Sequence, residues 1–474
     1  MLTRLRVQGF KNLVDAQVLF GPFTCIAGAN AVGKSNLFDA ISFLRDLTYF
    51  PIVEAAARVR DPVGKASDVT TLFTKTRKGP VNRMSFDCDI IVPSKVLDDF
   101  GRTCTPSITL LNYQVSFTLD HGDRLSGAKL VLEKEELTYI QKREAVRRLG
   151  FNHSLKFRNS VVFGRRTTPL ISTESAKDQT VIKLHQDGGS SGPAFRVPAR
   201  SSPRTLMGGV NTNDQPTVLA ARREMQSWML LQLEPSSLRR PDDFSAAPHI
   251  TQSGEHLPST LIRLGTDATV AGELSELLPD VKEVYVDQDE GRRLRTLMIR
   301  ARDGLEHAAR SLSDGTLRFL ALAVLGTDPE AGRLICLEEP ENGIHPSRVG
   351  AMLTLLQNIA VDPKEEVDDS NAFRQVIINT HSPLVVQSLP EDCLVIARSA
   401  ADPHGQQTTF SALSNTWRTK SDSSFKMPSA DLGEILSYLG DARAWMERQR
   451  AYKRSVLDYV QAQQLQLGLD TSDN

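Results

Sequence analysis

The residues from Gly28 to Ser35 have the types and spacing needed to bind the phosphates of a nucleotide. They read Gly-Ala-Asn-Ala-Val-Gly-Lys-Ser, which fits the pattern G-x-x-x-x-G-K-[ST] without a mismatch. In this pattern glycines let backbone N–H groups approach phosphate oxygens, the lysine neutralises the β- and γ-phosphates, and the serine hydroxyl ligates Mg²⁺. Lys34 and Ser35 occupy the last two positions. The alternative interpretation is a glycine turn that arose by chance.

Two adjacent carboxylates form a second candidate group. Four apolar residues, 334–337, are followed by Glu338, Glu339 and Pro340. A buried parallel strand presents its C-terminal end at the ligand crevice, so both acids are expected beside the phosphate loop. One carboxylate would hold the magnesium shell and the next would polarise the attacking water. Taken alone, the pair is equally well interpreted as a solvated acidic turn after a strand.

The elements that would position these groups alternate between strand and helix. Leu37, Ile41 and Leu44 follow the glycine loop at helical spacing. The other predicted elements are strands 2–7, 15–20 and 23–27, strand-like alternation over 81–120, a hairpin of 281–286 and 294–301, helix 315–325, strand 333–337, helix 347–359 and strand 375–379. Helices that alternate with apolar strands predict a parallel sheet, and the alternation over 81–120 predicts a small antiparallel sheet.

Four motifs occur in an order typical of one class of ATPases. They are Gly28-x-Asn30-x-x-Gly33-Lys34-Ser35-Asn36, Ser311-Leu-Ser313-Asp-Gly315-Thr316, Glu338-Glu339-Pro-Glu341-Asn-Gly343-Ile-His345-Pro and Asn379-Thr-His381-Ser-Pro. The series resembles the phosphate loop, signature motif, Walker B with D-loop, and switch histidine of ABC-type ATPases of the RecF/SMC and OLD-like branch. Within that branch it is most similar to prokaryotic AAA-family ATPases of anti-phage and toxin–antitoxin systems. The resemblance covers roughly residues 1–45 and 230–400.

The resemblance implies a role for each motif residue. ATP would be bound by Gly28, Asn30, Gly33, Lys34, Ser35 and Asn36, and by Ser313 and Gly315 reaching from a second copy of the chain. Mg²⁺ would be held by Ser35 and by Glu338, which replaces the usual aspartate. Glu339 would be the general base, and His381 would contact the γ-phosphate.

Purely structural roles remain open as alternatives for several of these residues. Ser313 would then only cap its own helix, and His381 would be an ordinary loop histidine. His345, which precedes a proline, is interpreted as structural. The motifs also depart from the family pattern, since the signature reads Ser-Asp-Gly and a glutamate stands at the Walker B aspartate. Hydrolysis is therefore expected to be slow, and Gln114 is a candidate for the Q-loop glutamine.

Composition and charge constrain the rest of the chain. With 474 residues, 40% hydrophobic and 24% charged, the chain has enough apolar material for two or three domains. We expect an α/β ABC-type P-loop ATPase head with a mostly parallel sheet, an antiparallel β subdomain and an α-rich insertion. The expected segments are 1–122, the N-terminal half of the head; 123–254, a basic insertion of helices and loops; 255–400, the C-terminal half; and 401–474, a helical tail.

The middle of the chain is basic. Residues 141–240 contain 17 lysines and arginines against 7 aspartates and glutamates, although the net charge of the chain is −1. This segment is a candidate contact for DNA or RNA phosphates. A solvated face, or a contact for an acidic partner protein, explains the pattern equally well.

Several features of other protein classes are missing from the pattern. No apolar run approaches the roughly 20 residues needed to cross a bilayer, and no signal peptide is expected, so we expect a cytoplasmic protein. The five cysteines are scattered and are expected in the core rather than in disulfides or zinc sites. We find no acidic cluster of the Toprim nuclease type that some OLD-like proteins carry.

These observations favour an ATPase that forms a homodimer or higher homo-oligomer around sandwiched ATP and controls a partner effector, a nuclease or toxin, in prokaryotic anti-phage defence. The assembly and the defence role come from the resemblance alone. The alternatives are a RecF-like DNA-binding clamp in repair or maintenance and, less consistent with the motifs, the ATPase subunit of an ABC transporter.

Overall fold

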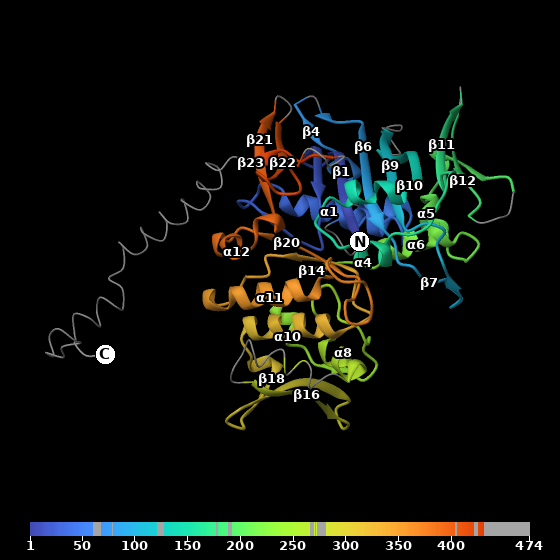
Figure 1. Ribbon diagram of the computed structural model, residues 1–474. Coiled ribbons are helices and arrows are strands. Elements are labelled where there is room, and N and C mark those ends of the chain that lie inside the picture. The colour runs from blue at the N-terminus through green and yellow to red at the C-terminus, as the bar shows by residue number, and fades with distance from the viewer. Residues whose placement is uncertain are drawn as a thin grey trace. The chain divides into compact units, whose positions relative to one another are not determined.

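The computed structural model describes residues 1–59, 68–77, 79–120, 128–176, 179–187, 192–265, 270, 272, 281–402, 405–420 and 425–430 (Figure 1). The chain divides into two units, Met1–Ser429 and Ala430–Asn474. All of the elements that position the candidate site belong to the first unit.

A mostly parallel sheet forms the centre of the first unit. Its parallel strands are, in spatial order, β14 (Trp228–Leu231), β19 (Leu334–Glu338), β20 (Gln375–Thr380), β3 (Phe23–Ala27) and β21 (Leu394–Asp402), and β22 (Gly405–Leu413) pairs antiparallel with β21. Every residue of β3 and β20 is buried, as expected for strands covered on both faces. The predicted parallel sheet is confirmed, and it also includes β14 and β21, which the sequence analysis did not identify.

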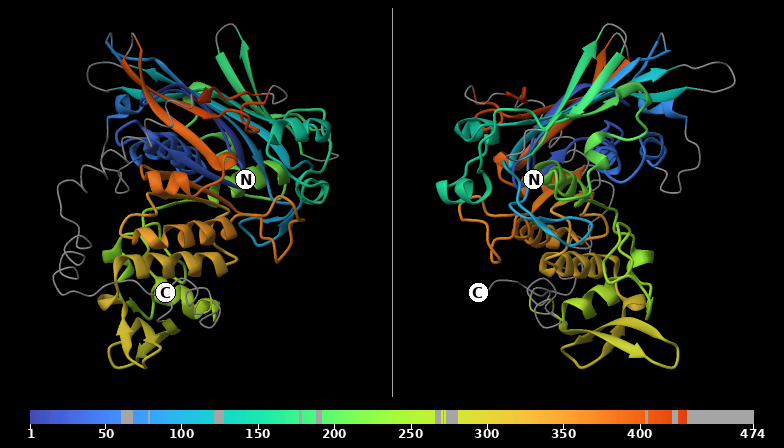
Figure 2. Two further views of the ribbon diagram at one scale, coloured as in Figure 1. Left: turned by 60° about the vertical axis from the view of Figure 1, so that its left-hand side comes forward. Right: turned by 90° about the vertical axis from the view of Figure 1, so that its right-hand side faces the viewer.

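An antiparallel sheet of eight strands makes the second layer (Figure 2). Its strands are, in spatial order, β13 (Phe195–Pro198), β12 (Gln179–Leu184), β11 (Ile171–Ala176), β10 (Lys129–Tyr139), β9 (Leu110–Asp120), β6 (Arg83–Ile91), β1 (Leu2–Phe10) and β2 (Leu13–Leu19). The predicted antiparallel sheet is therefore confirmed and is larger than expected.

Helix α1 (Lys34–Asp46) packs on this second layer. Phe43 of α1 contacts the rings of Phe10, Phe86 and Phe117 of the antiparallel sheet, with ring centroids 5.4 to 6.2 Å apart. Aromatic contacts at such distances stabilise the packing beyond the area they bury. The helix that follows the phosphate loop is thus held firmly against a rigid sheet.

A helical layer lies on the other side of the parallel sheet. Helices α10 (Asp314–Thr327) and α11 (Val349–Ile359) run side by side there, and α10 also packs on α7 (Pro235–Leu238) and α8 (Leu257–Leu264) (Figure 1). Beyond α10 lies a small antiparallel sheet of β15 (Asp242–Asp243), β16 (Val281–Asp289), β17 (Leu294–Ala301) and β18 (Glu306–Ala308). The predicted hairpin corresponds to β16 and β17.

The remaining elements are short, apart from α6 in the middle of the chain. They are α2 (Ile52–Ala57), η1 (Val69–Leu72), β4 (Lys75–Thr76), β5 (Gly79–Pro80), β7 (Val96–Leu97), β8 (Thr103–Cys104), η2 (Lys142–Glu144), α3 (Ala145–Leu149), α4 (Leu155–Val161), η3 (Ala199–Ser201), α5 (Leu206–Gly209), α6 (Pro216–Gln226), η4 (Ala309–Ser311), η5 (Pro346–Arg348), α12 (Pro383–Gln387), η6 (Glu391–Cys393) and β23 (Ser429–Ala430).

Segment 123–254 differs from the expected α-rich insertion. It contributes β10 to β13 to the antiparallel sheet and β14 to the parallel sheet. The charged stretch around residue 133 is a strand because Leu130, Leu132 and Leu137 reach the core from one face, while a register shift between residues 132 and 134 restores the alternation. The expectation of helices and loops was wrong for these strands and correct for α3 to α6.

Residues 401–474 also differ from the expected helical tail. Residues 405–413 form β22, which pairs with β21 along its whole length, so the ATPase head continues beyond residue 400. The helices expected over 431–467 lie outside the described residues. Four of the five cysteines are buried, as predicted.

Candidate functional site

The phosphate loop connects the buried strand β3 to helix α1. Gly33, the N-cap of α1, has a φ of 101°, in the region that favours glycine. A Cβ atom at this position would lie 2.2 Å from Nδ2 of Asn12 and from Oγ1 of Thr408. The Thr408 hydroxyl donates to the carbonyl oxygen of Val32 at 2.5 Å. The turn between β1 and β2 and the strand β22 therefore hold the loop closely, and a side chain at position 33 would displace both.

The Lys34 side chain folds back along this loop. Its Nζ donates to the carbonyl oxygens of Gly28 at 2.7 Å and Ala29 at 2.8 Å. Burial lowers the pKa of Lys34, while the carboxylates that follow β19 oppose the shift. The ammonium group is thus held beside the loop by two carbonyl oxygens that phosphate oxygens can replace as its partners.

A cavity of about 290 Å³ lies over the phosphate loop and the first turn of α1. Its walls come from the phosphate loop, α1 and the ends of β19 and β20. The lining residues are Asn12, Asn30, Ala31, Gly33, Lys34, Ser35, Asn36, Glu338, Glu339 and Asn379. Because a helix N-terminus and a lysine face the same space, the cavity suits a polyphosphate.

The carboxylates reach this cavity because three strands end together. Strands β3, β20 and β19 are parallel neighbours, with Ala27 opposite Thr380 and Asn379 opposite Glu338. The predicted position of the acids beside the phosphate loop therefore agrees with the structure.

Glu338 and Ser35 form a set of oxygen donors. They line both the cavity over the phosphate loop and an adjoining one of about 850 Å³. Gln232, directly after β14, donates from Nε2 to Oε2 of Glu338 at 3.5 Å. The oxygen atoms of a hydroxyl, a carboxylate and an amide can all be ligands of Mg²⁺, which usually also keeps several water ligands. The residues therefore fit a magnesium ion bound mainly through water and substrate phosphates.

Two hydrogen bonds orient the carboxylate of Glu339. Its Oε1 lies 2.7 Å from Nδ1 of His381, and its Oε2 accepts from Nδ2 of Asn342 at 2.7 Å. Its backbone N–H donates to both oxygens of Asn379, at 3.1 and 3.0 Å. Burial raises the pKa of Glu339, but the hydrogen bonds from Asn342 and His381 outweigh it, and the pKa lies below its usual value. The carboxylate is therefore ionised and fixed in direction.

The backbone of Glu339 is unusual as well. Its φ is 45°, which is uncommon for a residue with a side chain. Such a conformation costs free energy and is found at functional sites where the surroundings enforce it. Here the Asn379 contacts enforce it, and they turn the Glu339 side chain towards His381.

The residues of the predicted signature lie at the N-terminus of α10. Ser313 is the N-cap, and its Oγ accepts from the N–H of Thr316 at 3.2 Å, so the capping role considered for it is present. Both Ser313 and Asp314 are exposed. Within the described part of the chain, neither Ser313 nor Gly315 lines the cavity over the phosphate loop. The structure thus brings together the phosphate loop, both glutamates and His381, and leaves the signature turn apart.

Gln232 was missed by the sequence analysis. The candidate considered there, Gln114, lies on β9 and bonds to Asn112 at 2.9 Å and to Lys134 at 3.0 Å, away from the cavity. The sequence did contain a signal for Gln232: the short apolar run 228–231 is followed by a polar residue, just as the apolar run 334–337 is followed by Glu338. His345 caps η5 by accepting from Ser347 N–H, consistent with the structural interpretation.

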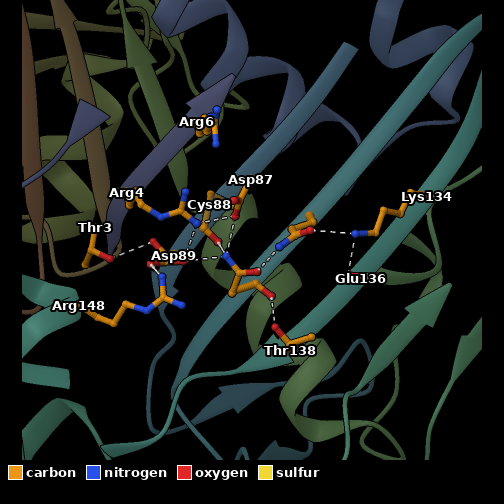
Figure 3. A network of polar contacts seen from close by, with 12 residues as sticks. Thr3, Arg4, Arg6, Asp87, Cys88, Asp89, Lys134, Glu136, Thr138 and Arg148 are labelled. Carbon is orange, nitrogen blue, oxygen red and sulfur yellow. Dashed lines mark hydrogen bonds and ion pairs between the residues drawn. The ribbon is translucent and has the colours of Figure 1, made fainter. Parts of the chain in front are cut away.

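The basic stretch 141–166 is partly neutralised within the chain. Arg148 lies 3.1 Å from Asp89, and Arg4 of β1 lies 3.0 Å from the same carboxylate. These residues belong to a buried polar network (Figure 3). Two further pairs are Lys156 with Glu365, at 3.7 Å, and Arg166 with Asp187, at 2.8 Å. By contrast, Lys142, Arg143 and Arg147 are exposed around η2 and α3.

Comparison with known proteins finds that part of the chain is similar to one family. It matches the family described as "AAA domain, putative AbiEii toxin, Type IV TA system" over residues 23–83 and 221–387, slightly less than half of its length. These segments contain all four motifs. No significant match to a curated protein was found. Among the helices that the structure describes, none is long and apolar enough to span a membrane.

Solved structures similar in fold include three SMC heads, which align with 87% of this chain. They are the SmcHead bound to the C-winged helix domain of ScpA (12% identity, TM-score 0.45, 98% of that chain), the SMC head domain from Thermotoga maritima (11%, 0.38, 98%) and the Smc head domain with an extended coiled coil bound to the C-terminal domain of ScpA derived from Pyrococcus furiosus (10%, 0.42, 96%).

The phosphate loop, the paired glutamates and the two-layer fold define a P-loop ATPase of the ABC type. More narrowly, the four motifs and the family match over slightly less than half of its length make this chain similar to the RecF/SMC and OLD-like branch of these ATPases.

Proposed function

We propose that this protein binds and slowly hydrolyses ATP with Mg²⁺, and that it is a switch that controls a partner effector in prokaryotic anti-phage defence. The observation that carries the enzymatic part is the ionised Glu339, fixed by His381 and Asn342 beside the phosphate loop. The defence role is supported by the similarity to a family described by a putative toxin of a Type IV toxin–antitoxin system.

The phosphate loop would bind the triphosphate. Backbone N–H groups between Gly28 and Gly33 would donate to phosphate oxygens. The ammonium group of Lys34 would leave the carbonyl oxygens of Gly28 and Ala29 and contact the β- and γ-phosphates instead. Asn30 and Asn36 line the same cavity and contribute amide groups. Mg²⁺, held by Ser35 and Glu338, would neutralise charge that develops on the phosphates.

Glu339 would act as the general base. Its lowered pKa keeps it ionised at neutral pH, so it can accept a proton from a water that attacks the γ-phosphate. His381 lies against this carboxylate in the structure. When a γ-phosphate is bound, His381 would donate to it from the other ring nitrogen. Because a glutamate replaces aspartate at position 338, magnesium is held less directly and turnover is slow.

A second copy of the chain would complete the site. Ser313 and Gly315 lie at the exposed N-terminus of α10, which carries a partial positive charge suited to a γ-phosphate. Since this turn does not line the cavity of its own chain, it is available to a nucleotide held by another copy. Two ATP molecules would then be sandwiched between two chains, and a nuclease or toxin would respond to that assembly.

Mixing two inactive variants tests this assembly. Lys34→Ala removes phosphate binding, and Ser313→Arg places a bulky cation on the signature turn; each alone should release no phosphate from ATP. Mixed in equal amounts, they should recover activity, because one site then combines an intact phosphate loop with an intact signature turn. Failure to recover, with each variant folded by circular dichroism, would contradict the shared site.

The alternative, a RecF-like clamp on nucleic acid, is favoured by one observation. Lys142, Arg143 and Arg147 are exposed on adjacent turns and form no ion pair with an acidic side chain among the described residues. A clamp would bind duplex DNA without any partner protein, with an affinity that rises with ATP and falls steeply with salt. Loss of that binding in a variant with these three cations replaced by glutamine would support the clamp.

A further inference from the structure

The signature turn carries a negative charge that its proposed role does not explain. Asp314 is the first residue of α10 and directly follows Ser313, and both are exposed. A carboxylate in the first turn favours the helix itself. It would nevertheless repel a triphosphate brought to the same turn, because like charges a few ångströms apart oppose each other strongly where water is excluded.

Arg239 neutralises this carboxylate. Its Nη2 donates to Oδ1 of Asp314 at 2.5 Å and to the carbonyl oxygen of Leu312 at 2.9 Å. The guanidinium thereby spans the turn, with one contact before Ser313 and one after it. Arg239 itself follows α7, which packs on α10.

The other side of the turn is fixed by the segment after Glu339. A Cβ atom on Gly315 would lie 3.0 Å from the carbonyl oxygen of Gly343. The turn is thus held between this backbone and the Arg239 side chain. About a third of the Arg239 side chain remains exposed, and within the described part of the chain its Nε and Nη1 form no hydrogen bond. Those donors are free to face an anion.

We propose that Arg239 is a positioning residue of the nucleotide site: it cancels the charge of Asp314 and holds the signature turn so that Ser313 can approach the triphosphate bound by a second copy of the chain. This inference rests on the proposed function. It assigns the pair to the half of the site that acts across the dimer, and it predicts that the charge of Asp314 becomes harmful when Arg239 is removed.

Removing the charges of Arg239 and Asp314 separately and together tests the proposed role of this pair. Arg239→Met should lower ATP turnover at least about tenfold, because it leaves Asp314 uncompensated. Asp314→Asn alone should lower turnover less than Arg239→Met does, because it removes the carboxylate whose charge Arg239 neutralises. The double variant should recover most of the loss. Since Asp314→Asn cannot restore the contact to the Leu312 carbonyl, recovery reports the charge and not the packing of the turn. A double variant no more active than Arg239→Met would overturn the proposal, as would an active Arg239→Met.

The neighbouring arginine provides a matched control. Arg240 pairs with Glu255 at 2.9 Å and is more exposed than Arg239. Arg240→Met removes the same charge one residue away and should leave turnover within about twofold of wild type. An equal loss in Arg240→Met and Arg239→Met would show a general effect of charge and contradict the proposed pair.

Subunit mixing separates this inference from the function on which it rests. Arg239→Met mixed with Lys34→Ala should recover turnover, because the intact Arg239 then lies opposite the intact phosphate loop. If Ser313→Arg with Lys34→Ala recovers and Arg239→Met with Lys34→Ala does not, Arg239 does not act across the dimer and the inference fails alone. If neither mixture recovers, the shared site itself is wrong.

Discussion

Glu339 is the side chain on which the proposed hydrolysis depends most. Both of its oxygens accept hydrogen bonds, its backbone adopts a positive φ, and its pKa is lowered although burial acts in the opposite direction. A residue with only a structural role gains little from an ionised carboxylate with a fixed direction. An ionised carboxylate with a fixed direction can accept a proton from one positioned water.

Replacement of Glu339 by Gln should separate binding from hydrolysis. The amide keeps the shape of the side chain and cannot accept the proton, so ATP turnover should fall about 10² to 10⁴-fold. Nucleotide affinity should stay close to wild type, because Lys34 and the loop backbone are unchanged. Phosphate release and binding of a fluorescent ATP analogue measure the two quantities. Normal turnover in this variant would remove Glu339 from the role of base.

The sequence predicted these residues unequally. Lys34, Ser35, Glu338 and Glu339 belong to contiguous motifs whose spacing is fixed by a single strand and turn, so their meeting in one cavity followed from the order of elements. The contact of Thr408 with Val32 could not be predicted, because it joins residues far apart in the chain through a strand pairing that no local pattern specifies.

Strand β10 illustrates how an element can depend on one buried carboxyl group. Glu135 is fully buried on this strand and accepts from the N–H groups of Leu206 and Met207, at 2.6 and 2.9 Å, and from Tyr113 at 3.3 Å. It therefore ties the start of α5 to the antiparallel sheet. Burial raises the pKa of Glu135 to about 7, although these hydrogen bonds act against the shift.

The stability of the fold should consequently fall as pH rises from about 4.5 to 7. Over this interval the folded chain retains a proton on Glu135 that the unfolded chain has released, so deprotonation costs up to about 3 kcal/mol of folding free energy. Urea unfolding at a series of pH values measures the slope. Glu135→Gln should flatten it, at the cost of one backbone N–H contact.

Glu133 provides the control for this measurement. It lies on the same strand, is partly exposed and pairs with Arg83. Glu133→Gln should leave the slope at its wild-type value. Equal slopes in wild type and Glu135→Gln would contradict the assignment of the titration to Glu135.

The same strand shows why part of the fold escaped prediction. The alternation of buried and exposed residues in this strand is interrupted by the register shift at residue 133, within a run of charged residues, 133–136. The sequence pattern therefore matched neither the period of a strand nor that of a helix. Strand β3, by contrast, was predicted with its observed bounds, because five apolar or small residues before a glycine loop leave little choice.

At the scale of the whole molecule, the site is divided. The phosphate loop and Glu339, the proposed base, lie in one cavity, while the N-terminus of α10 presents Ser313 to solvent. A helix N-terminus with a serine hydroxyl and an arginine-neutralised carboxylate suits an anion, yet the cavity of the same chain does not include it. In the proposed assembly a second copy of the chain brings the two halves together, so the oligomeric state should follow the nucleotide.

Glu339→Gln should therefore convert to a dimer when ATP and Mg²⁺ are added, because hydrolysis no longer releases the γ-phosphate that both chains contact. Light scattering after gel filtration measures the mass with ATP, with ADP and without nucleotide. ADP should leave the monomer, since the signature turn has no γ-phosphate to bind. Adding Ser313→Arg should abolish the dimer and leave ATP binding intact. A dimer that forms equally with ADP, or that survives Ser313→Arg, would mean that the chains associate through another surface and that each site is complete by itself.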